Sequence, residues 1–362
     1  MQNCKLLLIT VISVLFSVRL SAGNVDLEDS RLYITGAPYK EILDDGSLEF
    51  FRFSKTVRDR MRKRSKTIYR KSLVTSGITL SINTDSKEVT FSFYIPEGAI
   101  RRPFTFVALR DDKYFKKYVF PKKSKNFEIT VNNNSGGFHT FTLVFPIWGN
   151  PVLKQIRTDD GSSLKEVKKL SSGSYAACGS SETLGTGQKM GVQTYPYIIS
   201  RTLNKELYNL AVGENRVFFD IIDDIAKIPD LRIMTLISGS YELICCPSLK
   251  KYLNEYEQFL RRVREVQSEV DIYCISPFSN PTVKIKYKSS ETIESLSAMQ
   301  KAIVEKLRNE GDEHIFFIDS ADIVTRNDIS SISKWGNTFS IDGAKKFADV
   351  LVREINTNLI EF

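Results

Sequence analysis

Residues 179–185, Gly-Ser-Ser-Glu-Thr-Leu-Gly, have the composition of a nucleophile loop. Glycine at both ends allows a strand to turn sharply into a helix. Such a turn presents its central serine, Ser181, at the edge of a sheet. A serine hydroxyl held in this way can attack an ester carbonyl. Short Ser/Gly loops are common, so this pattern predicts a nucleophile only together with the residues around it.

A serine nucleophile needs a base that accepts its proton, and histidine is the usual one. The chain contains only two histidines, His139 and His314. His139 falls in a β-rich first half. His314 directly precedes a predicted strand at 315–319, which places it at the amino end of a sheet, away from Ser181. We therefore expect both histidines to be structural residues.

The first half of the chain, residues 24–158, is predicted to be an antiparallel β-sandwich resembling a jelly roll. Short alternating runs are separated by turn signals, and helical stretches are few. The expected strands are residues 48–53, two strands within 77–93 around a turn at 83–86, and residues 104–110, 127–131 and 139–145.

Residues 159–173 are rich in Ser, Gly, Asp and Lys and are predicted to be a linker. After it, five short apolar runs alternate with amphipathic helical stretches over 174–362, which predicts five parallel strands covered on both faces by helices. Ligands of such sheets bind at the carboxyl ends of the strands. A site should therefore follow the runs that end near residues 178, 211, 237 and 276, with the loop before the last helix.

The loop 179–185 resembles the first block of the SGNH/GDSL hydrolases, Gly-Asp-Ser-x-Thr-x-Gly or Gly-Thr-Ser-x-Thr-x-Gly. Further segments resemble a branch with an N-terminal β-sandwich that includes carbohydrate O-deacetylases. They are residues 195–196, 200–204 and 208–210, and in the first half 75–78, 83–86 and 142–147. The resemblance covers nearly the whole chain after the first residues. It implies a flavodoxin-like α/β/α hydrolase domain with Ser181 as the nucleophile.

The chain departs from that family where the base should lie. The family supplies Asp, then His three residues later, then Gly five residues after the His. Gly343 matches this Gly, which puts Thr338 in the His position and Trp335 in the Asp position. A threonine hydroxyl is not a base near neutral pH, and an indole can only donate a hydrogen bond. The comparison predicts a degenerate catalytic triad.

The groups that should stabilise an oxyanion are altered as well. The family uses the serine N–H, a Gly of a second block and an Asn of a third. Here Glu214 occupies the Gly position, where a carboxylate would oppose developing negative charge, and the adjacent Gly213 is the remaining candidate. The third block, residues 238–242, contains no Asn, although Tyr241 can donate a hydrogen bond.

Residues 1–23 are predicted to be a signal peptide that exports the protein to the periplasm or the outside of the cell. A basic start precedes an apolar run of 13 residues and small residues suited to cleavage. The run is too short for a stable membrane span, so a membrane anchor is the less favoured alternative. No later segment is apolar enough to cross a bilayer.

The charge and the cysteines limit the partners and cofactors. The formal net charge is +8, with basic clusters at 58–66 and 113–125. A simple solvated face is the favoured interpretation, and in an exported protein the alternative is a partner such as an acidic polymer or polysaccharide or a charged cell surface. Export and the lack of a recognition motif argue against nucleic acid. The four cysteines after residue 23 form no CxxC pair or His/Cys cluster, so we expect buried thiols, no metal and no cofactor.

Three functions remain open. The first is a catalytically impaired protein that binds glycan in the old cleft, with Tyr241, Trp335 and Glu214 lining it. The second is an active ester hydrolase or deacetylase that uses Ser181 with a carboxylate base. The candidate carboxylates are Glu182, Glu214, Glu242 and Asp342. The third is a surface-interaction protein that binds through its basic sandwich.

Overall fold

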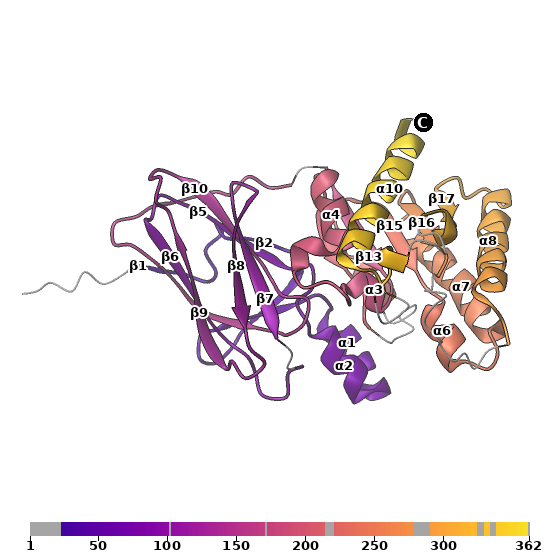
Figure 1. Ribbon diagram of the computed structural model, residues 1–362, viewed down its shortest axis with the longest axis horizontal. Coiled ribbons are helices and arrows are strands. Elements are labelled where there is room, and N and C mark those ends of the chain that lie inside the picture. Colours follow the sequence, from indigo (N-terminus) through magenta and orange to yellow (C-terminus); the bar gives the residue numbers. More distant parts are fainter. Residues whose placement is uncertain are drawn as a thin grey trace, which may run out of the picture.

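The computed structural model describes residues 23–100, 103–170, 172–213, 221–277, 290–323, 329–333 and 338–360. Two domains lie next to each other, an all-β domain followed by an α/β domain (Figure 1). This confirms the predicted fold class. The predicted signal peptide lies outside the described residues except for Gly23.

The first domain consists of two six-stranded antiparallel sheets. One sheet contains β3 (Tyr39–Ile42), β4 (Leu48–Phe51), β11 (Val152–Thr158), β6 (Glu88–Tyr94) and β9 (Asn126–Asn132) in this order, with β1 (Gly23–Val25) on β11. The other contains β12 (Leu164–Lys165), β5 (Thr79–Thr84), β10 (His139–Val144), β7 (Phe104–Arg110) and β8 (Lys113–Phe120), with β2 (Tyr33–Thr35) on β5. Side chains alternate between the core and the solvent along β9, as expected of a half-buried strand. Large aromatic residues fill the space between the sheets: Phe50, Phe91, Phe93, Phe106 and Phe141.

Both basic clusters belong to regular elements that the sequence analysis did not predict. The cluster 113–125 includes β8, an edge strand that exposes its lysines together with Tyr114 and Val119. The cluster 58–66 lies in two helices, α1 (Lys55–Arg64) and α2 (Lys66–Ser72), in the connection between β4 and β5. Ser54 caps α1 and Ser65 caps α2 by accepting hydrogen bonds from backbone N–H groups of the first turns.

The second domain has five parallel strands in the order β14-β13-β15-β16-β17. They are β13 (Ser174–Cys178), β14 (Glu206–Asn209), β15 (Leu231–Ile237), β16 (Asp271–Ile275) and β17 (Ile315–Ile318). The helices are α3 (Ser181–Leu184), α4 (Tyr195–Thr202), α5 (Ile222–Ile225), α6 (Ser240–Cys245), α7 (Lys250–Val266), α8 (Ile293–Asn309), α9 (Ser320–Ile323) and α10 (Ile341–Ile360), with 3-10 turns at Gly191–Gln193 and Ile329–Ser331. Every residue of the interior strand β13 is buried, as a sheet covered on both faces requires.

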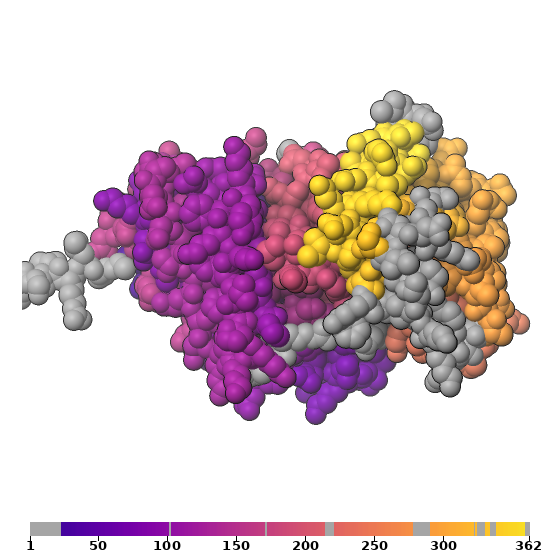
Figure 2. Space-filling view, viewed as in Figure 1, coloured from indigo at the N-terminus to yellow at the C-terminus, as the bar shows by residue number. Residues whose placement is uncertain are grey.

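The two domains share their hydrophobic cores. From α1, Val57 and Met61 are completely buried in the cluster that lies under one face of the parallel sheet. From the sandwich, Val107 and Val144 belong to the cluster on the other face. Figure 1 shows α1 and α2 reaching under the α/β domain, and Figure 2 shows the two domains in contact along their boundary. In the segment predicted to be a linker, β12 pairs with β5.

No disulfide joins the four cysteines in the described part of the chain, and Cys178 and Cys274 are buried. Burial raises the pKa of each of these two thiols to about 12. This agrees with the expectation of inert, buried thiols. Among the described residues, no helix is long and apolar enough to cross a membrane.

Candidate functional site

Ser181 lies at the start of α3, directly after the buried strand β13. A Cβ on Gly179 would lie 2.2 Å from Oγ1 of Thr183 and 2.9 Å from the carbonyl oxygen of Ile237, so only glycine fits here. Gly185 ends the short helix with φ +103°, a left-handed conformation that favours glycine. The two glycines thus shape the sharp turn that leaves Ser181 half-buried at the sheet edge.

The loop after β14 brings Gly213 against this serine. The N–H of Leu210 donates to Ala177 and the N–H of Val212 donates to Gly179, at 2.9 and 3.3 Å, so the loop runs alongside the end of β13. A Cβ built on Gly213 would lie 3.2 Å from Oγ of Ser181. The position predicted for the second oxyanion donor therefore adjoins the nucleophile position, while Glu214 lies outside the described residues.

The same loop is held by Arg52 from the sandwich domain, which is 1% exposed. Its Nη1 donates to the carbonyl oxygens of Asn209 and Ala211 at 2.7 and 2.8 Å. Its Nε donates to Val74 at 2.7 Å, and its Nη2 donates to Lys71 at 3.3 Å. Burial lowers the pKa of Arg52 to about 9, so the guanidinium is still charged at neutral pH. Arg52 therefore anchors the loop that carries Gly213 to the first domain.

A second group from the sandwich domain lies beside Gly213. The side chain of Lys71, in α2, is buried, and its Cδ lies 3.9 Å from the point that a Cβ on Gly213 would occupy. From the same connection, Ser76 Oγ donates to the carbonyl oxygen of Leu184 at 2.7 Å. The sequence analysis missed Lys71 and Arg52, because only the packing of the two domains brings them to the site.

The third block forms the turn from β15 into α6. Tyr241 lies half-buried in the first turn of α6, which follows the carboxyl end of β15. Gly239 has φ +114°, and a Cβ there would lie 2.7 Å from Leu296. Its N–H donates to Oε2 of the buried Glu242 at 3.1 Å, so this carboxylate caps the helix. A capping role competes with use of Glu242 as a base.

Thr338, at the family's histidine position, is buried in a small hydrogen-bonded loop. Its Oγ1 lies 2.5 Å from Oγ of Ser333, and its carbonyl oxygen accepts from the N–H of Ser333 at 2.7 Å. A Cβ on Gly343 would lie 1.7 Å from the carbonyl oxygen of Ser331, so the glycine used for alignment is required by packing. Trp335 lies outside the described residues.

The other carboxylates differ in environment. Burial raises the pKa of Glu182 to about 7, while its Oε1 accepts a hydrogen bond from the N–H of Ser180 at 3.0 Å. Asp342 is exposed on α10. Glu182 is thus a carboxyl group next to Ser181 in the sequence that titrates near neutrality.

The two histidines lie in ion pairs of their own. Nδ1 of His139, on β10, lies 2.6 Å from Asp111 in the sandwich. Nδ1 of His314 lies 2.9 Å from Asp271, before the amino ends of β17 and β16. His314 is therefore at the opposite edge of the sheet from Ser181, as predicted. Among the described residues, no group of three or more His, Cys, Asp or Glu side chains could hold a metal ion.

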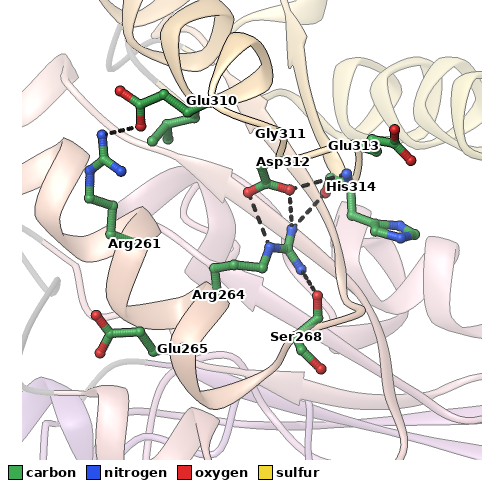
Figure 3. A pocket seen from close by; sticks show the side chains of 10 residues that line it. Arg261, Arg264, Glu265, Ser268, Glu310, Gly311, Asp312, Glu313 and His314 are labelled. Carbon is green, nitrogen blue, oxygen red and sulfur yellow. Dashed lines mark hydrogen bonds and ion pairs between the residues drawn. The ribbon is translucent and has the colours of Figure 1, made fainter.

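A cavity of about 530 Å³ near His314 is lined by side chains that form ion pairs with one another (Figure 3). There Arg261 binds Glu310, and Arg264 binds Asp312 and backbone carbonyl oxygens. These guanidinium groups stabilise the amino edge of the sheet. This cavity is therefore not our candidate site.

A second cavity, of about 720 Å³, lies between the two domains. It is lined by Lys117 and Trp148 from the sandwich and by Thr186, Gln188 and Lys189 from the loop after α3. Oγ1 of Thr186 and Oε1 of Gln188 are buried and have no hydrogen-bond partner among the described residues. The N–H of Thr186 donates to the carbonyl oxygen of Ser181 at 2.9 Å, so the cavity begins just beyond α3.

Solved structures with the same two-domain fold include three that carry different functional descriptions. A salicylyl-acyltransferase, SsfX3, from a tetracycline biosynthetic pathway matches with a TM-score of 0.80 and 18% identity, over 93% of this chain and 97% of that one. A protein described as a GDSL-like lipase, from Bacteroides ovatus, matches with a TM-score of 0.72 and 18% identity, over 91% of this chain and 96% of that one. A family two carbohydrate esterase from Clostridium thermocellum, in complex with cellohexaose, matches with a TM-score of 0.67 and 14% identity, over 90% of this chain and 99% of that one.

No protein-family model and no curated protein matches the sequence. At these identities the structural likenesses establish the fold. The chain shares their fold, an N-terminal β-domain followed by an α/β domain, as the sequence resemblance implied.

Proposed function

We propose that this protein binds acylated glycan beside Ser181 and has lost hydrolysis by the serine–histidine route. One observation carries the proposal. Ser181 adjoins Gly213, whereas the histidine position holds Thr338, whose buried hydroxyl is hydrogen-bonded to Ser333. Loss of the base from a related triad lowers turnover on the order of a millionfold.

Two further features support a glycan as the ligand. The family two carbohydrate esterase with the same fold is described in complex with cellohexaose. The interdomain cavity presents the indole of Trp148 and the buried oxygens of Thr186 and Gln188. Sugar sites commonly combine an aromatic face with a few fixed polar groups. In this proposal Tyr241, from the third block, is a further aromatic residue that contacts the glycan.

The test compares the mature chain with Ser181→Ala. Release of acetate from acetylated xylan and binding of cello-oligosaccharides by calorimetry are measured for both proteins. We expect release near the buffer rate from both, with measurable binding in the wild type. Ser181-dependent release far above the buffer rate would contradict the loss of hydrolysis, and absence of any glycan binding would contradict the binding role.

Glu182 favours a second candidate, an ester hydrolase with a carboxylate base. Because burial raises its pKa to about 7, this group could exchange a proton near neutral pH. Its position next to Ser181 in the chain makes it the first residue to replace. Glu182→Gln should abolish any Ser181-dependent release, whereas Glu255→Gln, on α7, should leave it unchanged.

Export and the basic surface belong to the same proposal. The apolar run at residues 6–18 supports cleavage near residue 23, which N-terminal sequencing of secreted protein would test. The exposed lysines of β8 favour an acidic polymer as a second partner of the sandwich. Binding that weakens steeply between low and high salt would support this, and salt-independent binding would contradict it.

A further inference from the structure

We infer that Lys71, which belongs to the sandwich domain, stabilises a negatively charged group bound beside the hydroxyl of Ser181. The inference rests on the proposed function and names the charge of the group that the site takes. Two ligands share this chemistry: the carboxylate of an acidic sugar, and the oxyanion of a tetrahedral adduct on the serine.

The geometry at Gly213 brings the two side chains together. A Cβ built on this glycine would lie 3.2 Å from Oγ of Ser181 and 3.9 Å from Cδ of Lys71. The serine hydroxyl and the lysine stem therefore border the same small space. Because Gly213 has no side chain, it adds no atom to this narrow space.

The fold fixes the lysine at this place. Lys71 is 7% exposed, in contrast to the exposed Lys66 at the start of the same helix. Its carbonyl oxygen accepts from Arg52, the residue that also binds the Gly213 loop through Ala211. One guanidinium thus joins the lysine backbone to the loop on which the site depends.

A buried ammonium acts on a nearby anion more strongly than a solvated one, because the local dielectric constant is lower. Preorganised positive groups beside a nucleophile stabilise the oxyanion that forms there. The family's third-block amide is absent, since Tyr241 and its neighbours contain no Asn. Lys71 lies on the Gly213 side of the serine, where such a group would act.

The interdomain cavity extends the positive surface. It is lined by Lys117 and Lys189. Trp148, which also lines it, packs against a small cluster that includes Leu184. Leu184 Cδ2 in turn lies 3.6 Å from the same point on Gly213. A polymer of acidic sugars therefore suits both the cavity and the serine end of the site.

The experiment uses the mature chain and three lysine variants. Lys71→Met keeps the length of the side chain and removes its charge, Lys71→Arg keeps the charge, and Lys66→Met is the matched control on the same helix. Thermal melting establishes that each variant is folded. A fluorophosphonate probe reports on Ser181 by intact mass, with Ser181→Ala as the blank. In this reaction the Oγ–P bond forms, the P–F bond breaks, fluoride leaves and the serine proton passes to water.

Binding of oligogalacturonate, measured by calorimetry, is the second readout. We expect Lys71→Met to slow labelling of Ser181 on the order of a hundredfold and to weaken oligogalacturonate binding about tenfold. Lys71→Arg should keep most of the labelling rate and most of the affinity for oligogalacturonate, and Lys66→Met should change neither quantity. A loss confined to labelling assigns the oxyanion as the ligand, and a loss confined to oligogalacturonate assigns the sugar carboxylate.

Equal labelling and equal affinity in the wild type and Lys71→Met would overturn the inference, and so would a wild type that neither labels nor binds. Neutral cello-oligosaccharides measured alongside separate this from the proposed function. If they bind and the charge readouts do not depend on Lys71, only the inference fails. If no glycan binds while labelling still depends on Lys71, only the proposed glycan binding fails.

Discussion

Arg52 of the sandwich domain and Ala211 of the α/β domain are joined by a buried hydrogen bond of 2.8 Å, from Nη1 to the carbonyl oxygen. The same guanidinium binds carbonyl oxygens on both sides of the domain boundary. A positive charge is thereby placed inside the molecule at the loop that carries Gly213.

Arg52→Met should lower the free energy of unfolding by about 3 kcal/mol or more, because several buried carbonyl oxygens lose their donor. Denaturant unfolding followed by circular dichroism measures the change. Arg62→Met, on the exposed surface of α1, is the control and should stay within about 0.5 kcal/mol of the wild type. Equal stability of the two variants would show that the buried bonds contribute little.

Glu182 should make stability depend on pH. Its pKa is raised from 4.5 to about 7 in the folded chain, so the folded state binds more protons than the unfolded state between these values. Stability contributed by this group is greatest below about pH 4.5 and is lost as the pH rises to about 7, by about 3 kcal/mol. Unfolding midpoints of the wild type and Glu182→Gln, taken from pH 5 to 8, should diverge accordingly, and parallel curves would refute the assignment.

Restoring the family's residues should restore turnover. The double variant Trp335→Asp, Thr338→His supplies a base and its orienting acid, and general base catalysis typically contributes about a hundredfold or more. Hydrolysis of 4-nitrophenyl acetate should rise by at least that factor and vanish when Ser181→Ala is added. A folded double variant that remains at the buffer rate would mean that these positions do not face Ser181.

Gly213→Ala should slow the reaction of Ser181, whereas Gly343→Ala should destabilise the fold. At Gly213 the new methyl group would lie 3.2 Å from Oγ of Ser181, so the chain should fold while labelling of Ser181 slows at least tenfold. At Gly343 the methyl group would lie 1.7 Å from a carbonyl oxygen of Ser331, so the melting temperature should fall markedly. Melting curves and intact-mass labelling test both, and unchanged labelling in Gly213→Ala would contradict the close approach of Gly213 to the serine hydroxyl.

The sequence was sufficient to predict both fold classes and most of the elements. Strand β7 begins and ends at the predicted residues, and the five parallel strands follow the five apolar runs. Hydrophobic periodicity explains this success, because it follows from which face of an element is buried. The edge strand β8 and helices α1 and α2 were missed because their many lysines and arginines resemble an unstructured charged surface.

The site could be predicted only in part. Ser181 and Gly213 belong to local blocks whose order in the chain matches a known family, so their positions could be assigned, and their roles stay predictions. Lys71 and Arg52 are more than a hundred residues away in the sequence, in another domain. No local pattern marks them, since their proximity to the serine arises from packing between domains. The pKa of Glu182 likewise depends on burial that composition does not reveal.

The two helices between β4 and β5 also bear on how such proteins can be taken apart or recombined. Val57 and Met61 complete a core that belongs mainly to the other domain. A chain cut at the predicted linker would lose them together with Arg52 and Lys71. The sandwich therefore cannot simply be exchanged for another domain. A chimera that joins a different domain to residues 174–362 would also have to keep the helical connection between β4 and β5.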